Sequence, residues 1–522
     1  MKTAPEHRVW RNWAGTATAA PVRWCRPRSE AEIATAVKDA AASGLTVRAL
    51  GSGHSFTAVA ATDGVALDLS GWTGITAADT RTGLVTVRSG TRLRALNAEL
   101  SGLGLAMANL GDIDAQTPAG ALSTGTHGTG ARLGGLATQV EGLELVLADG
   151  STVTCSASTR PDLFAAARIG LGALGVVTSV TLRCVPAFTL LADERPVPVD
   201  EVLEQFDALA EGNDHCEFYW FPYGRNALVK RNNRVPEGAE AGSGGAVPPP
   251  LPAWRRFWEF EVMENAGFGA LCRLGRARPR LIPALNRFSS SVLSARTYSE
   301  TSHRVFVTPR RVRFTESEYA VPRESLGHVL AELRRAVPRL PHPVMFPVEV
   351  RVAAADDIWL STAYGRESAY VAIHQYAGLP YQDYFDRFES IVAEVAGRPH
   401  WGKMHSLDAA RLSALYPRFG DFLRVRAEAD PEGRFGNAYL TRVLALLAPL
   451  SLLAPLASGR PQSASSLLAR RKLLARQSRR RPRPSARGRP GGLGFRTLTT
   501  CYRLLTQVCG LERDRAVARS QG

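Results

Sequence analysis

The segment from Gly111 to Gly130 constrains this chain more than any other, because it carries almost no bulky side chains. Its twenty residues include five glycines and five serines or threonines, with His127 near the end. Such a stretch exposes backbone amides and hydroxyls, which suits an extended anionic ligand better than a packed core. The alternative is a long surface loop, although a loop of this length with so little charge would be unusual. We therefore predict that the segment binds a ligand.

Two shorter glycine-rich segments occur beside predicted strands. Gly-Ser-Gly-His-Ser-Phe at 51–56 follows a predicted strand at 45–50, so its backbone can approach a pyrophosphate closely. Residues 170–175 have G-x-G-x-x-G spacing, but a predicted strand at 176–184 follows them, where a Rossmann motif needs a helix. Helical and strand patterns alternate around these segments, which predicts one α+β domain of nucleotide-binding type over 1–190.

The next 200 residues show strands in which polar and apolar side chains alternate. In the strand predicted at 346–352, Glu349 and Arg351 share one face and the valines share the other. In the strand predicted at 370–376, His374 lies on a polar face with two tyrosines. A solvated sheet face is the alternative for these residues. Lys403 lies between two histidines, but nothing in the spacing fits a metal site.

The positive charge of the chain is concentrated at its end. The net charge is +16, and residues 446–522 hold 16 of the 64 Lys and Arg but only two of the 48 Asp and Glu. The body, residues 1–445, is therefore almost neutral, which argues against specific nucleic-acid binding by the folded part. The final segment has two aromatic residues and an Arg/Pro-rich run at 479–489, which predicts a basic, disordered tail.

The cysteines and the hydropathy indicate the compartment. The seven cysteines are widely spaced and form no C-x-x-C pair, so neither a disulfide framework nor a zinc site is indicated. The first residues lack the apolar core of a secretory signal, and no apolar run reaches the roughly 18 residues that a membrane span needs. We predict a cytoplasmic protein.

Several motifs occur in order along residues 10–445, and together they resemble one family. They are Gly-Ser-Gly-His-Ser-Phe at 51–56, Ser-Thr-Gly-Thr-His-Gly-Thr-Gly at 123–130, Phe-Pro-Val-Glu-Val-Arg at 346–351, His-Trp-Gly-Lys at 400–403 and Phe-Gly-Asn-Ala-Tyr at 435–439. The chain is similar to the sugar-1,4-lactone oxidase family. These FAD-linked enzymes include D-arabinono- and L-gulono-1,4-lactone oxidases and dehydrogenases, with alditol oxidase as a relative.

The resemblance implies the vanillyl-alcohol oxidase fold, which is α+β with two domains. An FAD-binding domain is expected over 1–190 and a cap domain with an antiparallel sheet over 191–400. A segment at 401–445 is expected to return to the flavin. The basic tail, 446–522, has no counterpart in the resemblance.

The same resemblance implies FAD as the cofactor, bonded through His54 to the flavin 8α-methyl group. That bond requires a neutral, unhindered imidazole. The segment at 170–177 is expected to close over the flavin. The residues implied in FAD binding are Gly51, Ser52, Gly53, His54, Ser55, Thr117, Gly120, Thr124, Gly125, Thr126, His127, Gly128, Gly130, Gly175 and Val177.

The implied reaction removes a hydride from the carbon next to a lactone carbonyl and a proton from its hydroxyl. Glu349 is expected to anchor substrate hydroxyls. Arg351 and Lys403 are expected to place positive charge near the substrate oxygen or the flavin. His374 is the candidate base, since imidazole titrates near neutral pH. No metal is expected.

Other functions are compatible with the sequence. An alditol oxidase would use the same flavin, although the surroundings of Glu349 and His374 favour a lactone. The electron acceptor is O₂ or a redox protein, and the oligomeric state is undetermined. The tail offers a separate hypothesis, a basic segment that binds nucleic acid or an acidic membrane, and peripheral membrane association is an expectation. A reading-frame change near residue 440 would also explain its composition.

Overall fold

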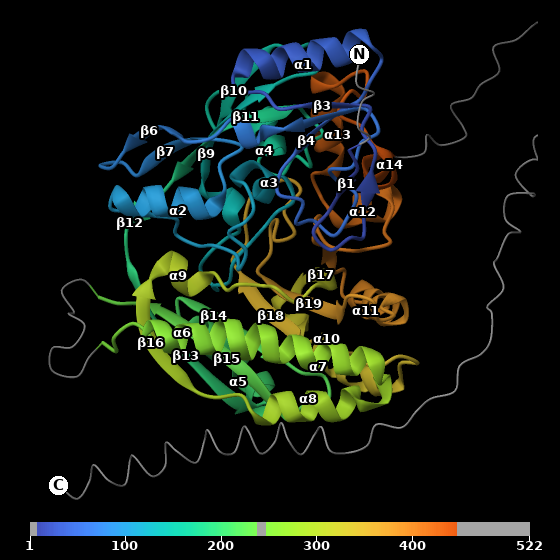
Figure 1. Cartoon of the computed structure of the whole chain (residues 1–522). Helices are drawn as coiled ribbons and strands as arrows, with labels where there is room; N and C mark the ends of the chain where they lie inside the picture. The colour runs from blue at the N-terminus through green and yellow to red at the C-terminus, as the bar shows by residue number, and fades with distance from the viewer. Residues whose placement is uncertain (1–7, 237–246, 446–522) are drawn as a thin grey trace, which may run out of the picture. The chain divides into compact units, whose positions relative to one another are not determined.

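The computed structural model describes residues 8–236 and 247–445, which form two halves (Figure 1). The expected disordered tail, 446–522, lies outside the described residues. The first half is drawn in blue and cyan in Figure 1, with the C-terminal helices in orange beside it. The second half is drawn in green and yellow and holds one large sheet.

A three-stranded parallel sheet, in the order β3–β5–β4, begins the first half. Helix α1 (Glu30–Ala42) carries the chain from β3 to β4, and such a crossover is what a parallel pair requires. Ser29 caps α1, because its hydroxyl accepts a hydrogen bond from the Glu32 amide (3.2 Å). The strands are β3 (Arg23–Cys25), β4 (Val47–Leu50) and β5 (Val65–Asp68).

An antiparallel five-stranded sheet, in the order β10–β9–β11–β7–β6, forms the rest of this half. Its strands are β6 (Ile75–Asp79), β7 (Leu84–Arg88), β9 (Val140–Val146), β10 (Thr152–Ser156) and β11 (Val176–Arg183). The accompanying helices are α2 (Leu93–Gly102) and α4 (Pro161–Ala167). Two small antiparallel pairs are β1 (Trp10–Arg11) with β2 (Thr18–Ala19), and β8 (Leu105–Ala106) with β12 (Val185–Pro186).

The glycine-rich segment Gly111–Gly130 contains a short helix that its composition did not predict. Helix α3 (Pro118–Ser123) begins with proline, and the Thr117 hydroxyl accepts a hydrogen bond from the Gly120 amide (3.2 Å). A threonine cap followed by proline is a common start for a helix, so this local signal was present in the sequence.

The second half is built on one antiparallel sheet in the order β16–β13–β15–β14–β18–β19–β17–β20. The strands are β13 (Thr189–Pro198), β14 (His215–Trp220), β15 (Asn226–Arg234), β16 (Arg296–Thr301), β17 (Phe314–Pro322), β18 (Val348–Ala353), β19 (Ser368–Tyr376) and β20 (Arg398–Pro399). The expectation of an antiparallel sheet in this half is confirmed.

The two faces of this sheet differ in chemistry. Helices α5 (Val199–Glu211), α10 (Leu326–Ala336) and α11 (Gln382–Ala393) share an apolar core with one face. The Phe206 and Phe218 rings, for example, lie 4.9 Å apart. The other face carries charged residues from neighbouring strands and contacts the first half. Burying one face under helices therefore leaves a polar face against the first half.

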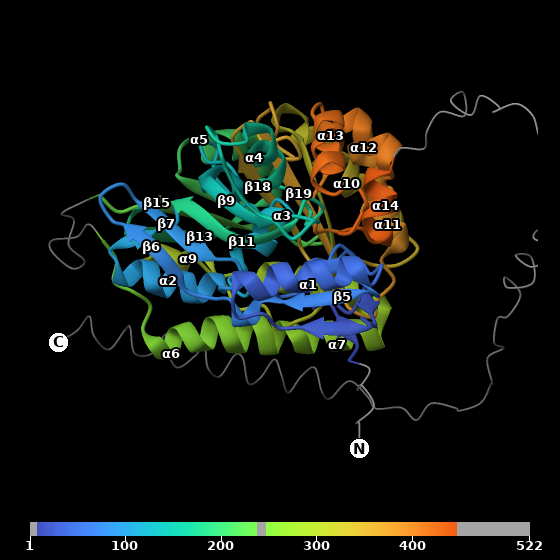
Figure 2. The same cartoon turned by 90° about the horizontal axis from the view of Figure 1, so that it is seen from above.

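A helical excursion packs against this half through Cys272 and Ile282, which share a buried apolar cluster with Met345. It runs through α6 (Ala253–Arg256), the π-helical η3 (Phe257–Gly267) and α7 (Phe268–Ala277), and returns in α8 (Ile282–Ser291). Figure 2 shows the α6–α7 helix along one edge of the body. A short helix, α9 (Ser302–Phe306), follows β16.

The C-terminal helices pack on the first half of the molecule (Figure 1). They are α12 (Ala409–Leu415), α13 (Phe419–Ala429) and α14 (Ala438–Leu444). The Val47 amide of β4 donates a hydrogen bond to the Arg434 carbonyl (2.8 Å). The Asn437 amide group donates to the carbonyls of Ala58 (3.1 Å) and Ala61 (2.9 Å). The C-terminal segment thus supplies hydrogen-bond partners to backbone groups near the start of the chain.

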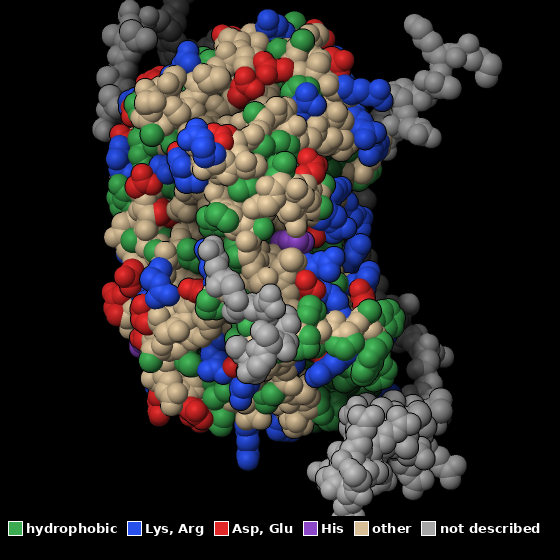
Figure 3. Space-filling model, turned by 90° about the vertical axis from the view of Figure 1, so that its left-hand side faces the viewer, with side chains coloured by type: hydrophobic (Ala, Val, Ile, Leu, Met, Phe, Trp, Pro, Cys, Tyr) green, Lys and Arg blue, Asp and Glu red, His purple; other side chains and the backbone are tan. Residues whose placement is uncertain are grey.

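The surface of the body carries both signs of charge. Figure 3 shows Lys and Arg side chains interspersed with Asp and Glu side chains over one face. This agrees with the near-neutral composition of residues 1–445. Among the described residues, no helix is both long enough and apolar enough to cross a bilayer.

Candidate functional site

A cleft of about 860 Å³, open to solvent, lies in the first half where β4 ends. It is bordered by the 51–55 loop, by the start of α3 and by residues 171–177. The sequence-predicted cofactor residues that line it are Gly51, Ser52, Gly53, His54, Ser55, Thr117, Gly120, Thr124, Gly175 and Val177. The structure thus brings together three segments that are far apart in the sequence.

Glycines allow the two walls of this cleft to approach each other. A Cβ atom on Gly120 would lie 3.0 Å from the Thr117 hydroxyl oxygen, and one on Gly51 would lie 3.3 Å from the same atom. Gly53 has a φ of +70°, which side chains rarely adopt. A cradle of bare backbone at this point fits a phosphate chain, because amides can approach the anion without a side chain between them. The residues present therefore fit the pyrophosphate of FAD.

The His54 side chain lines the cleft in a state that favours nucleophilic attack. Its ring stacks on Trp13, with centroids 5.8 Å apart. Burial, with Arg92 and Lys403 adding positive charge nearby, lowers the pKa of His54 to about 4. The imidazole is therefore neutral at physiological pH, which the expected flavin bond requires.

Arg48 is a cleft residue that sequence reasoning missed. It is 3% exposed, and its guanidinium donates hydrogen bonds to the carbonyls of Val59 (2.6 Å), Leu171 (2.8 Å), Gly172 (2.7 Å) and Phe435 (2.7 Å). Burial, with Arg426 next, lowers its pKa to about 10. An arginine in the middle of an apolar strand was the available signal. It ties the cleft loops to the C-terminal segment and brings a positive charge to the cleft wall.

The remaining predicted cofactor residues do not line this cleft. They are Gly125, Thr126, His127, Gly128 and Gly130. Gly130 pairs with Ala353 in an isolated bridge, and Gly128 borders a second, smaller cavity. The structure thus separates these five from the other ten, and their role in FAD binding stays a prediction.

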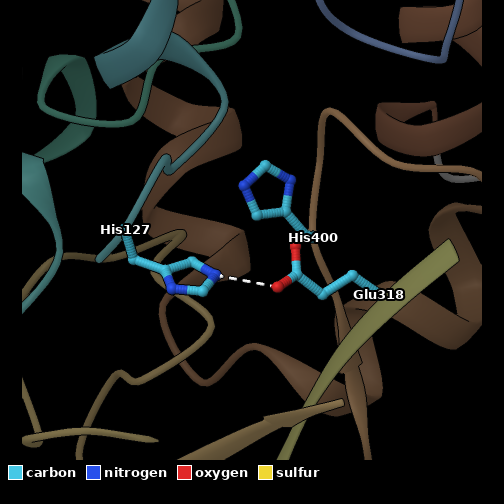
Figure 4. A group of neighbouring side chains, drawn as sticks. All are labelled: His127, Glu318 and His400. Atoms are coloured by element: carbon cyan, nitrogen blue, oxygen red, sulfur yellow. Dashed lines mark hydrogen bonds and ion pairs between the residues drawn. The ribbon is translucent and has the colours of Figure 1, made fainter. Parts of the chain in front are cut away.

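His127 belongs to a buried cluster at the junction of the two halves (Figure 4). Its Nε2 lies 3.1 Å from Glu318 of β17, and its ring stacks on Tyr370 with centroids 3.6 Å apart. Burial alone would raise the pKa of Glu318, but His127 and Lys403 hold it well below the usual value. His400 completes the group, and burial lowers its pKa to about 3.

The polar face of the large sheet holds the predicted catalytic pair. The Arg351 guanidinium donates to Glu217 (2.8 Å) on β14 and to Asp112 (2.6 Å) in the first half, and it also contacts Glu349. The Tyr219 hydroxyl donates to Glu349 (3.1 Å). Burial raises the pKa of Glu349. Arg351 opposes this rise, and Asp112 and Glu217 add to it. Glu349 is therefore held between Arg351, which favours its charged form, and two carboxylates, which oppose it.

His374 and Lys403 lie on the same face and share one carboxylate, Glu316 of β17. His374 Nε2 is 3.4 Å from Glu316 and 3.9 Å from Glu349, and the Lys403 ammonium also pairs with Glu316. Burial alone would lower the pKa of His374, but Glu316 and Glu349 raise it. Burial would raise the pKa of Glu316, whereas Lys403 and then His374 lower it to about 2. The structure therefore joins Glu349, Arg351, His374 and Lys403 in one ion-pair chain.

Aromatic rings connect this charged face to the cleft. The Phe314 ring lies 5.3 Å from Trp13 and 5.0 Å from His374. The Lys403 ammonium lies 5.2 Å from the Phe56 ring centroid. The charged sheet face and the glycine-lined cleft are therefore parts of one site.

Sequence reasoning missed several members of this face. They are Asp112, Glu217, Tyr219, Glu316 and Glu318. Period-2 alternation could have found most of them, because Glu217 and Tyr219 share a face of β14, and Glu316 and Glu318 share a face of β17. Asp112 follows no such pattern, because it lies in the loop that contacts the sheet.

Two groups of carboxylates or imidazoles have the spacing of a metal site. They are His127, Glu318 and His400, and Asp112, Glu217 and Glu349. In the first group, His127 already bonds Glu318 and Lys403 lies 3.9 Å from that carboxylate. In the second, the Arg351 guanidinium contacts all three carboxylates. Neighbouring cations already balance the carboxylates of both groups, and neither is needed for the site described here.

Comparison with known proteins finds similarity over nearly all of the described chain. The model of the D-arabinono-1,4-lactone oxidase family matches residues 180–443, and that of an FAD-binding domain family matches residues 21–156. The chain is 44% identical to an L-gulono-1,4-lactone dehydrogenase of Mycobacterium tuberculosis, over 84% of this chain and 99% of that protein. It is 34% identical to the L-gulonolactone oxidase of Mus musculus, over 83% and 98% respectively.

More distant proteins share the architecture. An alditol oxidase of a Streptomyces species is 32% identical, over 83% of this chain and 98% of that protein. The solved structure of a cholesterol oxidase from B. sterolicum superposes with a TM-score of 0.68, over 84% of this chain and 96% of that one. At 17% identity, this last likeness shows the fold alone.

Proposed function

Because the chain belongs to the family of FAD-linked sugar-1,4-lactone oxidases and dehydrogenases, we propose that it oxidises a sugar-1,4-lactone at the hydroxyl next to the carbonyl. D-arabinono- and L-gulono-1,4-lactone are the proposed substrates, because the relatives carry these names. The bound FAD supplies the acceptor for the hydride. The product is a 2-keto lactone.

The observation that carries the proposal is the contact between the glycine-lined cleft and the charged sheet face. Phe314 touches both Trp13, which stacks on His54, and His374. A cofactor held in the cleft by the 51–55 loop and Thr117 would thus meet a substrate held on the sheet. Arg48 supports the same cradle from behind, through the carbonyls of the 171–172 loop.

We assign a role to each charged residue on this face. Glu349 accepts hydrogen bonds from substrate hydroxyls, and Arg351 fixes Glu349 in place. Lys403 places positive charge beside the reacting oxygen, which favours loss of the hydroxyl proton. His374 accepts that proton in its neutral form. Because its pKa is raised, the neutral form is scarce at low pH, so oxidation is expected to accelerate as pH rises.

The bond between FAD and His54 is part of the proposal. Its support is the neutral state of His54 and its position on the cleft wall beside Ser55. Among the described residues, no hydrogen bond engages the ring nitrogens of His54, so either nitrogen is available for attack.

The experiment that tests the function follows flavin absorbance without oxygen. The purified protein is mixed anaerobically with L-gulono-1,4-lactone, D-arabinono-1,4-lactone and an alditol. We expect both lactones to bleach the flavin and the alditol to do so poorly. Bleaching by the alditol alone would replace the lactone function with alditol oxidation. Reoxidation by O₂ or by a cytochrome then identifies the electron acceptor, which is O₂ or a redox protein.

A matched pair of lysine variants tests the site in the same assay. Lys403→Met is expected to slow flavin reduction about 100-fold or more, because the charge beside the reacting oxygen is lost. Lys38 is an exposed lysine on α1, so Lys38→Met is expected to leave the rate of flavin reduction unchanged. Equal rates in the two variants would remove Lys403 from the mechanism.

We also propose a cytoplasmic location with peripheral membrane association. The support is an exposed aromatic group at the start of the helical excursion: Trp254 is 68% exposed, Phe257 63% and Trp258 44%. Arg255 and Arg256 lie among them, and aromatic rings with arginines are typical of helices that lie at a lipid surface. Flotation with anionic vesicles should carry the protein upward, and Trp254→Ser combined with Trp258→Ser should reduce the fraction that floats. Flotation unchanged by that variant would contradict the assignment.

A further inference from the structure

A second cavity lies on the same charged sheet face, beyond Arg351. It is small and opens to solvent. Its polar walls are Asp112, Glu194, Glu217, Lys230, Asn232 and Arg351. In the strand order, β14, β15 and β13 lie on one side of β18, and β19 and β17 lie on the other. The cavity and the His374–Lys403 group therefore flank Arg351 on opposite sides.

The charges along this wall alternate in sign. Glu194 pairs in register with Lys230, and Lys230 pairs in register with Glu217, which accepts a hydrogen bond from Arg351 (2.8 Å). A hydroxyl group both donates and accepts hydrogen bonds, so a row of alternating acceptors and donors matches a chain of hydroxyls.

The net charge of the wall points to a neutral ligand. Arg296 pairs with Glu194 (2.6 Å) and Arg310 with Asp112 (2.5 Å) from outside the cavity. Lys230 lies 3.7 Å from Glu217, and Glu349 pairs with Arg351, so each charge of the wall has a partner. An anion or a cation would bring a charge without a free partner, which is costly in a buried site.

One residue of the wall has a buried polar atom without a hydrogen-bond partner. Asn232 is 7% exposed, and its Oδ1 has no hydrogen-bond partner among the described residues. Buried amide oxygens in folded proteins are nearly always bonded, so an exception on a cavity wall marks a place where a bound group donates. A ligand hydroxyl would meet this requirement.

We propose that this cavity is the subsite for the polyol chain that projects from the lactone ring, an inference that rests on the proposed function. A lactone anchored at Glu349 with its reacting carbon toward the cleft would direct that chain past Arg351. A six-carbon lactone carries a two-hydroxyl chain, whereas a five-carbon lactone carries one hydroxyl. The subsite therefore selects the longer chain.

The test compares Asn232→Leu with the wild type on two substrates, L-gulono-1,4-lactone and D-arabinono-1,4-lactone. We expect kcat/KM for the six-carbon lactone to fall about tenfold or more, mainly through KM, with little change for the five-carbon lactone. The neighbouring variant Asn233→Leu is the control. Asn233 bonds to Asn213 on the opposite face of β15, so its loss should leave the ratio of the two substrates unchanged.

Every result bears on the inference. An equal change on both lactones, or no change on either, overturns the subsite while leaving the proposed function intact. If neither lactone bleaches the wild-type flavin, the proposed function and the subsite are both rejected. Should Asn232→Leu not fold, the wild type is compared on L-gulono-1,4-lactone and its 6-deoxy form. A loss of about tenfold on the deoxy form supports the subsite, and equal kcat/KM values overturn it.

Discussion

Glu316 lies between two basic side chains of the proposed site, His374 and Lys403. It raises the pKa of both groups, and Lys403 and then His374 lower the pKa of Glu316 to about 2. A base in such a pair must release its own proton before it can accept another. The pH dependence of the reaction therefore depends on a residue that is not itself proposed to touch the substrate.

The variant Glu316→Gln removes this charge and keeps the shape. In the wild type, flavin reduction should rise with pH through a value above about 6.5, the ordinary pKa of histidine. Without the carboxylate, the pKa of His374 should fall, so the rise should shift by about 1 pH unit to lower pH. Stopped-flow reduction across a pH series measures the shift. Glu318→Gln, on the same strand face but without contact to His374, should shift it less, and an unmoved profile in Glu316→Gln would reject His374 as the base.

His54 offers a test at the same scale. If the flavin is bonded to it, acid-precipitated protein stays yellow, and His54→Ala releases the colour to the supernatant. His303→Ala, which changes a half-buried histidine outside the cleft, should keep the pellet yellow. A colourless wild-type pellet would contradict the covalent bond.

The residues of the site were partly predictable. Glu349, Arg351, His374 and Lys403 were expected from the resemblance to the family, with strand alternation in support, and the structure brings them together. Glu316 was missed although it alternates with Glu318, because one charged residue in a strand does not show which neighbouring strand it will face. Which pKa values rise depends on those cross-strand neighbours, which the sequence alone does not show.

At the scale of elements, the strands were easier to predict than the loops that join them. The strands predicted at 45–50 and 176–184 follow from apolar runs, and the structure contains them as β4 and β11. Helix α3 was missed because its glycine-rich surroundings suggested an extended loop. Its cap and first proline decide the local structure instead.

Arg48 shows how one side chain can hold several elements together. Arg48→Met would remove the hydrogen-bond donor of four carbonyl groups. These belong to Val59, to Leu171 and Gly172 of the 171–172 loop, and to Phe435 of the C-terminal segment. We expect the free energy of unfolding to fall by about 3 kcal/mol, and FAD to be lost more readily. Urea denaturation and flavin content measure both. Arg94→Met, an exposed arginine on α2, should cost less than about 1 kcal/mol. An equal loss of unfolding free energy in the two variants would mean that Arg48 contributes no more to stability than an exposed arginine.

At the scale of the whole molecule, the two-domain α+β fold predicted from the motifs is confirmed, because both family models and the cholesterol oxidase structure agree with it. The resemblance carried this prediction, since periodicity alone gave only alternating strands and helices. The domain bounds, 1–190, 191–400 and 401–445, stay predictions.

Removing the basic tail tests where the activity resides. A chain of residues 1–445 should keep its flavin content and its rate of lactone oxidation, because every proposed site residue lies within the described body. The full chain should bind vesicles or nucleic acid more strongly at low salt, since 446–522 carries most of the net charge. Loss of flavin on truncation would show that the enzyme needs its tail.

The hydrogen bonds from Asn437 and Arg434 to the first strands have a consequence for biosynthesis. A ribosome releases the 51–55 loop and its parallel sheet long before residues 434–437 leave the exit tunnel. The sheet then lacks partners for the Val47 amide and the Ala58 and Ala61 carbonyls during synthesis of almost 400 residues. The flavin-binding half is therefore the first part to be made, and some of its backbone hydrogen bonds can form only once residues 434–437 have left the ribosome.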